Sequence, residues 1–250
     1  MSKMKEPNRS LLLALALFKK QIICVLLLLL FFIRNNAVAE TPLFRNVPWG
    51  TRYTEACDIM KETELTITKR AIKNLQIREY MGVISSDSKA LSEYDLGFVA
   101  NCDKPDISVA GHDIYYMEAA FAYVPNEKGE FTFTSEDSVL IEGYYWFEPC
   151  KDQIELSFLF NELEEKISGL YGSPSQKFSN TYIPFNPEKD YVIWEVEDVT
   201  IVLLKYHMDG WEENNNVYLS YGWNKADEYL QEADRIRRTI DPIKENVDGL

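Results

Sequence analysis

The sequence is poor in histidine and cysteine, two residues that often carry chemistry at neutral pH. Its 250 residues include only two histidines, His112 and His207, and four cysteines. Histidine is the usual general acid or base near pH 7. A structural zinc site takes four Cys or His ligands, and these residues are scattered along the chain. The scarcity of both residue types therefore argues against histidine-based catalysis and against zinc binding.

The familiar catalytic and cofactor-binding motifs are missing as well. The sequence has no Gly-x-Ser-x-Gly, His-Glu-x-x-His or Gly-x-Gly-x-x-Gly motif, and no phosphate-binding loop. Residues 209–216 are rich in oxygen ligands of the kind that calcium binds, but their spacing does not fit an EF-hand. We interpret this stretch as a polar turn between two strands. The sequence therefore predicts no catalytic residues, no metal and no cofactor.

No apolar run is long enough to cross a membrane. The longest, Ile22–Ile33, has 12 residues, whereas a transmembrane helix needs about 20. A longer span starting at Leu11 would bury the Lys19–Lys20 pair, and each lysine would cost about 2.5–3.5 kcal/mol there. The run follows a basic N-terminus and precedes the small residues of Ala37–Ala39. This is the pattern of a cleavable secretory signal peptide.

We therefore predict that residues 1–39 are removed on export and that the mature chain begins at Glu40, without a membrane span. The expected location is secreted or periplasmic, in a bacterium. Cleavage would remove six of the 26 basic and one of the 40 acidic residues, leaving a net charge of −19. So negative a surface repels nucleic acid. The expected partner is another envelope or secreted protein.

Three cysteines remain after the predicted cleavage, Cys57, Cys102 and Cys150. Export permits disulfides, but an odd number allows at most one internal bridge. Cys57 falls in an apolar helical row with Tyr53 and Met60, so we expect it to be a small buried hydrophobic residue. If any pair is bonded, we expect it to be Cys102 with Cys150.

The first half of the mature chain begins with a predicted helix, which Thr51 caps and whose buried side carries Tyr53 and Met60. Residues 61–101 are polar, with a weaker helical pattern at residues 69–80. Alternating apolar residues then predict strands at residues 114–124, 130–134 and 139–147.

The second half begins with a longer predicted helix. Asp152 and Glu155 form a capping box at its start, and Gly172 and Pro174 follow its end. Its buried side is expected to carry Leu156, Leu159, Leu163, Ile167 and Leu170. Strands are expected at residues 191–196, 199–206 and 217–223. Asn224 then caps a C-terminal helix whose inward residues are Ala226, Leu230, Ala233, Ile236 or Arg237, and Ile240.

This order of elements predicts an α+β fold, with helices packed on one face of an antiparallel sheet. Hydrophobic residues make up 46% of the chain and aromatic residues 13%, which is enough for a folded core. The order of helix, strands, helix, strands, helix also predicts two unequal pseudo-repeated units. The first spans residues 40–150, and the second spans residues 151–250 and includes the C-terminal helix.

Three short motifs carry a resemblance to known proteins: Val47-Pro48-Trp49-Gly50 before a helix, Tyr171-Gly172-Ser173-Pro174 after one, and Trp194 on a later strand. With them the chain resembles uncharacterised exported bacterial proteins built from tandem helix-plus-sheet units. Those proteins are similar to the beta-lactamase inhibitory protein and to small outer-membrane assembly lipoproteins. This chain departs from them by lacking a lipidation motif and by its long segment 61–101. The resemblance implies a protein-binding module and transfers no site residues.

Acidic and aromatic residues lie side by side on several predicted strands. This mixture is typical of sugar-binding faces, and also of ordinary strands with one face in water. We select Glu118, Glu142, Tyr144, Trp146, Trp194 and Glu195 as candidate binding residues. The favoured function is a non-catalytic exported module that binds a protein or peptide. The alternatives are a carbohydrate-binding or carbohydrate-active protein, and a structural component of the envelope.

N-terminal sequencing of exported material tests the signal peptide. We expect the first residue to be Glu40, because the small residues at positions 37 and 39 satisfy the peptidase. A protein that starts at Met1, or anywhere before residue 30, would contradict this and restore the membrane anchor that starts at Leu11.

Overall fold

A computed structural model describes residues 41–60, 66–72, 94–180, 188–207 and 215–241. Contacts divide the chain into two units, and Thr41–Leu250 is the unit that contains all of these residues. Its described part consists of a nine-stranded antiparallel sheet and three α-helices. The predicted α+β class is therefore confirmed. No helix in the described ranges is long and apolar enough to cross a membrane.

The strands follow one another with few helices between them. They are β1 (Thr66–Ile72), β2 (Gly97–Asp103), β3 (Ser108–Val109), β4 (His112–Tyr123), β5 (Ser138–Phe147), β6 (Gln176–Asn180), β7 (Glu188–Val196), β8 (Val199–His207) and β9 (Asn216–Trp223). The helices are α2 (Tyr53–Met60), α3 (Gln153–Tyr171) and α4 (Ala226–Ile240).

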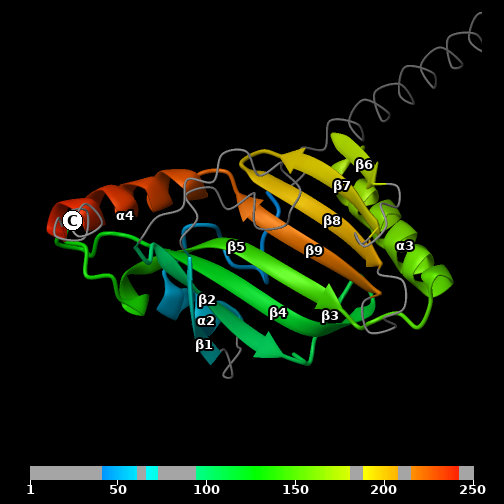
Figure 1. The fold of residues 1–250 in the computed structure, drawn as a ribbon, viewed down its shortest axis with the longest axis horizontal. Helices are drawn as coiled ribbons and strands as arrows, with labels where there is room; N and C mark the ends of the chain where they lie inside the picture. The colour runs from blue at the N-terminus through cyan, green and yellow to red at the C-terminus, as the bar shows by residue number, and fades with distance from the viewer. Residues whose placement is uncertain (1–40, 61–65, 73–93, 181–187, 208–214, 242–250) are drawn as a thin grey trace, which may run out of the picture. The chain divides into compact units, whose positions relative to one another are not determined.

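The order of the strands is symmetric about the middle of the sheet. It runs β1-β2-β4-β5-β9-β8-β7-β6, with the short β3 beside β4. The last strand of each half therefore pairs with the last strand of the other, over Glu142–Trp146 of β5 and Tyr218–Gly222 of β9. β5 and β9 lie side by side in Figure 1, with β4 beyond one and β8 beyond the other. Two copies of one helix-plus-sheet unit would produce this order, while the unit boundary at residue 150 stays a prediction.

The start of α3 is set by local side-chain chemistry, as predicted. The Asp152 carboxylate accepts hydrogen bonds from the backbone N–H groups of Ile154 and Glu155, both at 2.9 Å. Glu155 reaches back to the backbone N–H of Lys151 at 2.8 Å. These bonds satisfy N–H groups that have no partner within the helix. Four of the five residues predicted for its inner face are buried: Leu156, Leu159, Leu163 and Ile167.

The helices pack on both faces of the sheet. Tyr53 of α2 contacts Phe98 and Phe121 edge-on, with ring centroids 5.3 and 5.0 Å away. Val99, the neighbour of Phe98 in β2, lies instead in a buried cluster with Leu230 of α4. Because successive residues of a strand point to opposite faces, α2 and α4 lie on opposite faces.

The long helix α3 shares the face of α2. The indole N–H of Trp194 donates to the carbonyl of Gly172 at the end of α3, at 3.2 Å. Strand pairing links Trp194 to Ala119 across the sheet through Ile201, Tyr221 and Gly143. Ala119 points the same way as Phe121, towards α2. The predicted packing of helices on one face of the sheet is therefore found for α2 and α3.

The C-terminal helix α4 is the exception. Its apolar residues Ala226, Leu230 and Ala233 are buried against Val99 and Ile141 on the other face. That part of the sheet is apolar and includes Tyr144 of β5, so an amphipathic helix stabilises it by covering it. The turn from β9 into α4 is short, and Lys225, with no capping side-chain bond, occupies the cap position predicted for Asn224.

Several local predictions are wrong. β1 is a strand where the sequence suggested a helix beginning at residue 69, and the rest of that pattern lies outside the described residues. Residues 130–134 are not a strand, because Phe133 has a φ of 54° and cannot extend the chain there. Leu170 and Ile240 lie in the last turns of their helices, and 70% and 63% of their surfaces are exposed.

A glycine in β5 makes room for a buried ring from the N-terminal segment. Phe44 is fully buried and lies over Gly143, next to Tyr145 at a centroid distance of 4.8 Å. A Cβ atom on Gly143 would lie 2.1 Å from Cδ2 of Phe44. A larger residue at position 143 is therefore incompatible with this packing.

Replacing that glycine tests the packing. We expect Gly143→Ala to lower the free energy of unfolding by about 1–3 kcal/mol or more, the usual cost of overpacking. Gly169→Ala is the control, because nothing lies within 4 Å of its Cβ and it sits in helix α3. That change should raise the free energy by about 0.5–1 kcal/mol. Equal effects in urea denaturation would contradict the placement of Phe44.

Candidate functional site

Five of the six candidate binding residues lie on one face of the sheet. Glu118 of β4 pairs directly with Tyr144 of β5, and Glu142 and Trp146 are two residues away from Tyr144 on either side. Glu195 joins the same face through the row from Glu142 across Gly222 and Thr200. Tertiary structure thus brings together residues that are widely separated in the sequence.

Trp194 is the exception among the six candidates. It is 1% exposed and points to the opposite face, where it donates to the end of α3. The reason is the alternation of a strand: Glu195 faces one side, so its neighbour Trp194 faces the other. Trp194 belongs to the core between α3 and the sheet.

An unbroken row of large side chains crosses the same face. We call it the aromatic row, and the face that carries it the aromatic face. The row crosses β4, β5, β9, β8, β7 and β6 at Tyr116, Trp146, Tyr218, Leu204, Tyr191 and Phe178. Leu204 is buried, the four residues Tyr116, Trp146, Tyr218 and Tyr191 are half-buried, and Phe178 is 47% exposed.

Ring contacts hold the row together. Tyr116 stacks on Trp146 with centroids 4.2 Å apart and an interplanar angle of 17°. Tyr218 meets Trp146 edge-on at 5.7 Å. At the other end, Phe178 lies 5.5 Å from Tyr191. Aromatic pairs of this kind stabilise by about 0.5–1.5 kcal/mol beyond the area that they bury. The row is therefore a rigid feature of the sheet.

The carboxylates next to the row accept hydrogen bonds from hydroxyl groups. The Tyr116 hydroxyl donates to Glu118 at 2.7 Å, and that of Tyr144 donates to Glu142. Both acids are buried, with 4% and 6% exposure. Glu195 is exposed and accepts a hydrogen bond from the hydroxyl of Thr200 at 2.7 Å.

Negative charge near Tyr116 contributes to raising the pKa of its hydroxyl group. Burial, followed by the hydrogen bond to Glu118, raises the pKa of Tyr116 to about 12. The charges of Glu118 and Asp103 add to this increase. Because both make a phenolate less favourable, Tyr116 stays protonated and remains a hydrogen-bond donor at physiological pH. This end of the row therefore lies in a negative field.

Sequence reasoning missed Tyr116, Tyr218, Tyr191 and Phe178. Period-two spacing could have found Tyr116, because it precedes Glu118 by two residues on one strand. Tyr218 lies on a predicted strand, but only the pairing of β5 with β9 places it beside Trp146. Phe178 was missed because β6 is short and polar, and no strand was predicted there.

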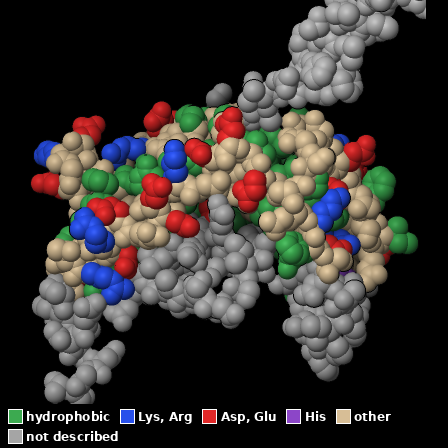
Figure 2. Space-filling model, turned by 90° about the horizontal axis from the view of Figure 1, so that it is seen from above, with side chains coloured by type: hydrophobic (Ala, Val, Ile, Leu, Met, Phe, Trp, Pro, Cys, Tyr) green, Lys and Arg blue, Asp and Glu red, His purple; other side chains and the backbone are tan. Residues whose placement is uncertain are grey.

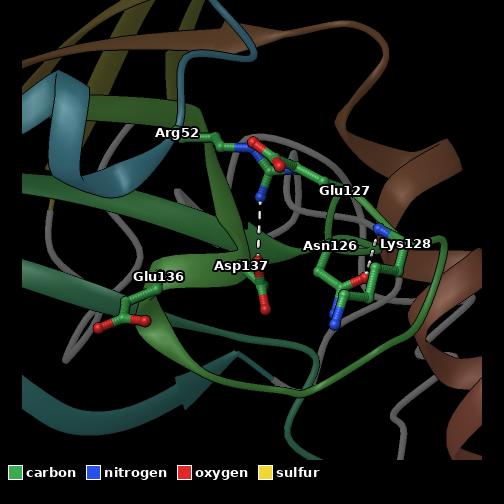
Figure 3. A pocket seen from close by; sticks show the side chains of 6 residues that line it. All are labelled: Arg52, Asn126, Glu127, Lys128, Glu136 and Asp137. Carbon is green, nitrogen blue, oxygen red and sulfur yellow. Dashed lines mark hydrogen bonds and ion pairs between the residues drawn. The ribbon is translucent and has the colours of Figure 1, made fainter.

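A separate pocket of about 360 Å³ lies where β4 connects to β5. It is lined by Arg52, Asn126, Glu127, Lys128, Glu136 and Asp137 (Figure 3). Arg52 pairs with Asp137 at 3.2 Å and donates to the carbonyl of Pro125 at 3.1 Å. The Asn126 side chain accepts from the backbone N–H groups of Lys128 and Glu130. These contacts hold the turn in place, so we assign Arg52, Asp137 and Asn126 a structural role.

The two histidines have different neighbours and do not share a site. His112 lies 3.4 Å from Glu162 of α3, and His207 contacts Asn215. Within the described residues, no group of three or more His, Cys, Asp or Glu side chains could hold a metal ion. Most of the oxygen-rich stretch 209–216 lies outside the described residues.

Cys102 and Cys150, the pair that we expected if any cysteines were bonded, are not bridged in the structure. Both residues are buried free thiols, and Cys57 is a half-buried one. β4 lies between β2, which carries Cys102, and β5, which Cys150 follows.

Comparison with protein-family models, with curated proteins and with solved structures finds no match to the chain. The resemblance to the beta-lactamase inhibitory protein therefore stays an expectation.

Alkylation tests the state of the cysteines. After denaturation without a reductant, we expect mass spectrometry to show Cys57, Cys102 and Cys150 all modified. In the native protein, Cys150 should react slowly, because burial raises the pKa of its thiol to about 11 and little thiolate is present. Two cysteines that react only after reduction would contradict the free thiols.

Proposed function

We propose that this chain is an exported, non-catalytic binding protein that holds a protein or peptide partner on its aromatic face. The single observation that carries the proposal is the aromatic row, which crosses six neighbouring strands and ends at the exposed ring of Phe178. α3 packs on the opposite face, and α4 covers the part formed by β2, β4 and β5. The six residues of the aromatic row do not belong to the described buried cluster that α4 covers.

The chemistry of the row suits a protein surface. Tyrosine and tryptophan are enriched at the centres of interfaces, where they bury much area and lose little conformational freedom. Here the sheet fixes the rings in advance through the stacking of Tyr116 on Trp146. A partner that binds such a surface loses less of its binding free energy to ordering.

The acids of this face support binding more than catalysis. Glu118 and Glu142 each accept a hydrogen bond from a tyrosine hydroxyl, and Glu195 accepts one from Thr200. A general acid or base needs a proton path to substrate, usually with a shifted pKa. In this arrangement the carboxylates hold neighbouring side chains in place.

A carbohydrate enzyme is the second candidate, and one observation favours it. Glu118 and Glu142 are diagonal neighbours on β4 and β5, because Glu118 pairs with Tyr144 and Glu142 with Ala120. Such neighbours lie about 7–8 Å apart, with their Cβ atoms somewhat closer, which is compatible with the roughly 5–9.5 Å between the carboxyls of glycosidases. Against it, a sugar stacks on a free ring face, and Tyr116 already covers one face of Trp146. A structural role in the envelope has no specific observation in its favour.

Site-specific photo-crosslinking in the native envelope tests the proposal. A photoreactive phenylalanine replaces Phe178 on the aromatic face, or Phe158 on α3, which is 69% exposed and serves as the matched control. We expect a discrete crosslinked protein from position 178 and none from position 158. The same products from both positions, or none from 178, would contradict a partner on the aromatic face.

A screen of glycans tests the second candidate. We expect no hydrolysis, because Glu118 and Glu142 hold tyrosine hydroxyls. Turnover of a glycan by the wild-type protein that Glu142→Gln abolishes, with the fold retained, would replace the binding proposal by a carbohydrate enzyme.

A further inference from the structure

Strand β6 forms one edge of the sheet. In the part of the chain that the structure describes, β7 is the only strand that pairs with it, along its whole length from Gln176 to Asn180. An antiparallel strand turns its backbone N–H and C=O groups alternately to its two sides. About half of these groups in β6 therefore point away from β7, and Figure 1 shows the strand at the border of the sheet.

The surface of β6 is open to solvent. Every residue from Gln176 to Ser179 is exposed. Phe178 keeps 47% of its surface in solvent, although its ring contacts Tyr191 of β7. Figure 2 shows hydrophobic side chains at the surface toward the end of the molecule where Figure 1 labels β6. The edge thus offers unpaired backbone groups next to an exposed ring.

The usual protections of an edge strand are missing from β6. Proteins guard such edges with a proline, a bulge, or a charged side chain that meets an approaching strand. The five residues of β6 include no proline, and their register with β7 has no shift. The charged side chain of the strand, Lys177, pairs with Glu164 of α3. That ion pair directs the ammonium group toward the helix, so it guards the edge poorly.

Resting on the proposed function, we propose that the partner contributes an extended segment that pairs with the outer edge of β6 and becomes a further strand of the sheet. Its main chain would satisfy the outward-pointing N–H and C=O groups of β6, and its alternate side chains would supply specificity. The residue opposite Phe178 would lengthen the aromatic row by one position. We expect an aromatic or β-branched residue there, because such pairs stabilise neighbouring strands.

Size and charge favour a segment of another protein over a second copy of this chain. A strand of five residues is about 17 Å long. Two copies that met through β6 alone would fall short of the roughly 1,000 Å² that a specific interface between folded proteins buries. Each copy also has a formal net charge of −14, so two copies repel each other. A short extended segment needs no surface beyond the edge and its exposed ring.

A strand-forming peptide tests the inference on the mature protein. The probe is the capped heptapeptide Lys-Thr-Val-Tyr-Val-Thr-Lys. Its counterpart has the same side chains and charge, but methyl groups on its interior backbone nitrogens remove the donors that pair strands. In an NMR titration we expect the probe to bind and the methylated peptide to bind at least about tenfold more weakly. Equal binding of the two peptides, or no binding of the probe at about 1 mM, would overturn the inference.

Amide hydrogen exchange shows where the probe pairs. In the free protein, we expect fast exchange at alternate residues of β6, because their N–H groups point away from β7. A saturating amount of the probe should slow these amides at least about tenfold, and the methylated peptide should leave them unchanged. Protection of other strands with no change in β6 would contradict an added strand.

Matched variants test the role of the exposed ring. Phe178→Lys should weaken binding of the probe at least about fivefold, because it removes the ring and places a charge at the edge. Phe158→Lys, the same change at an exposed position of α3, should leave binding unchanged. Phe178→Ala is a second variant, which removes the ring without adding charge and should weaken binding about threefold. A thermal melt verifies that each variant is folded, and equal losses at positions 178 and 158 would overturn the site.

The outcomes distinguish this inference from the proposed function. A crosslinked partner at position 178 that leaves the amides of β6 unprotected would overturn the added strand, but the proposed function would stand. No crosslink at that position would contradict the proposed function itself. Sedimentation that shows a dimer of the mature protein, and a monomer after Phe178→Lys, would place a second copy at the edge and overturn the segment of another protein.

Discussion

The pairing of β5 with β9 is the constraint on which the rest of the molecule depends. Each half of the sheet is a run of antiparallel strands, and among the described strands this pair is the one that joins them. It places Trp146 directly opposite Tyr218 and Glu142 opposite Gly222. Without it, the aromatic row would be two short, unconnected pieces, and Glu195 would have no relation to Glu118.

The two faces of the sheet then take different roles, because side chains alternate along every strand. One face is a conventional core, in which α2 and α3 bury large residues such as Trp194 and Phe121 and Phe44 lies over Gly143. The other is divided. α4 covers an apolar part that includes Tyr144, and the remainder holds tyrosines, a tryptophan and carboxylates that accept hydrogen bonds from hydroxyl groups. Polar groups are tolerated there because hydroxyls satisfy the acids.

Local rules predicted part of this arrangement and failed where distant contacts decide. The capping residue and four buried positions of α3 follow from Asp152 and a 3.6-residue period, and the strands 114–124, 139–147, 199–206 and 217–223 follow from alternation. β2 was missed although it is buried, and Gly97 is one reason, since it reads as a turn. There the absence of a side chain lets the strand lie against β4, where a Cβ would be 2.1 Å from the carbonyl oxygen of Phe121.

The sequence by itself determined the α+β class and the strand alternation, because these depend on neighbours along the chain. Only the tertiary structure decided that Trp194 turns inward, that Cys102 and Cys150 stay apart, and that α4 crosses to the second face. It also decided that Tyr116, Trp146 and Tyr218 form one row. Strand order and register produce these results, and both are set by contacts between residues far apart in the chain, which no local pattern encodes.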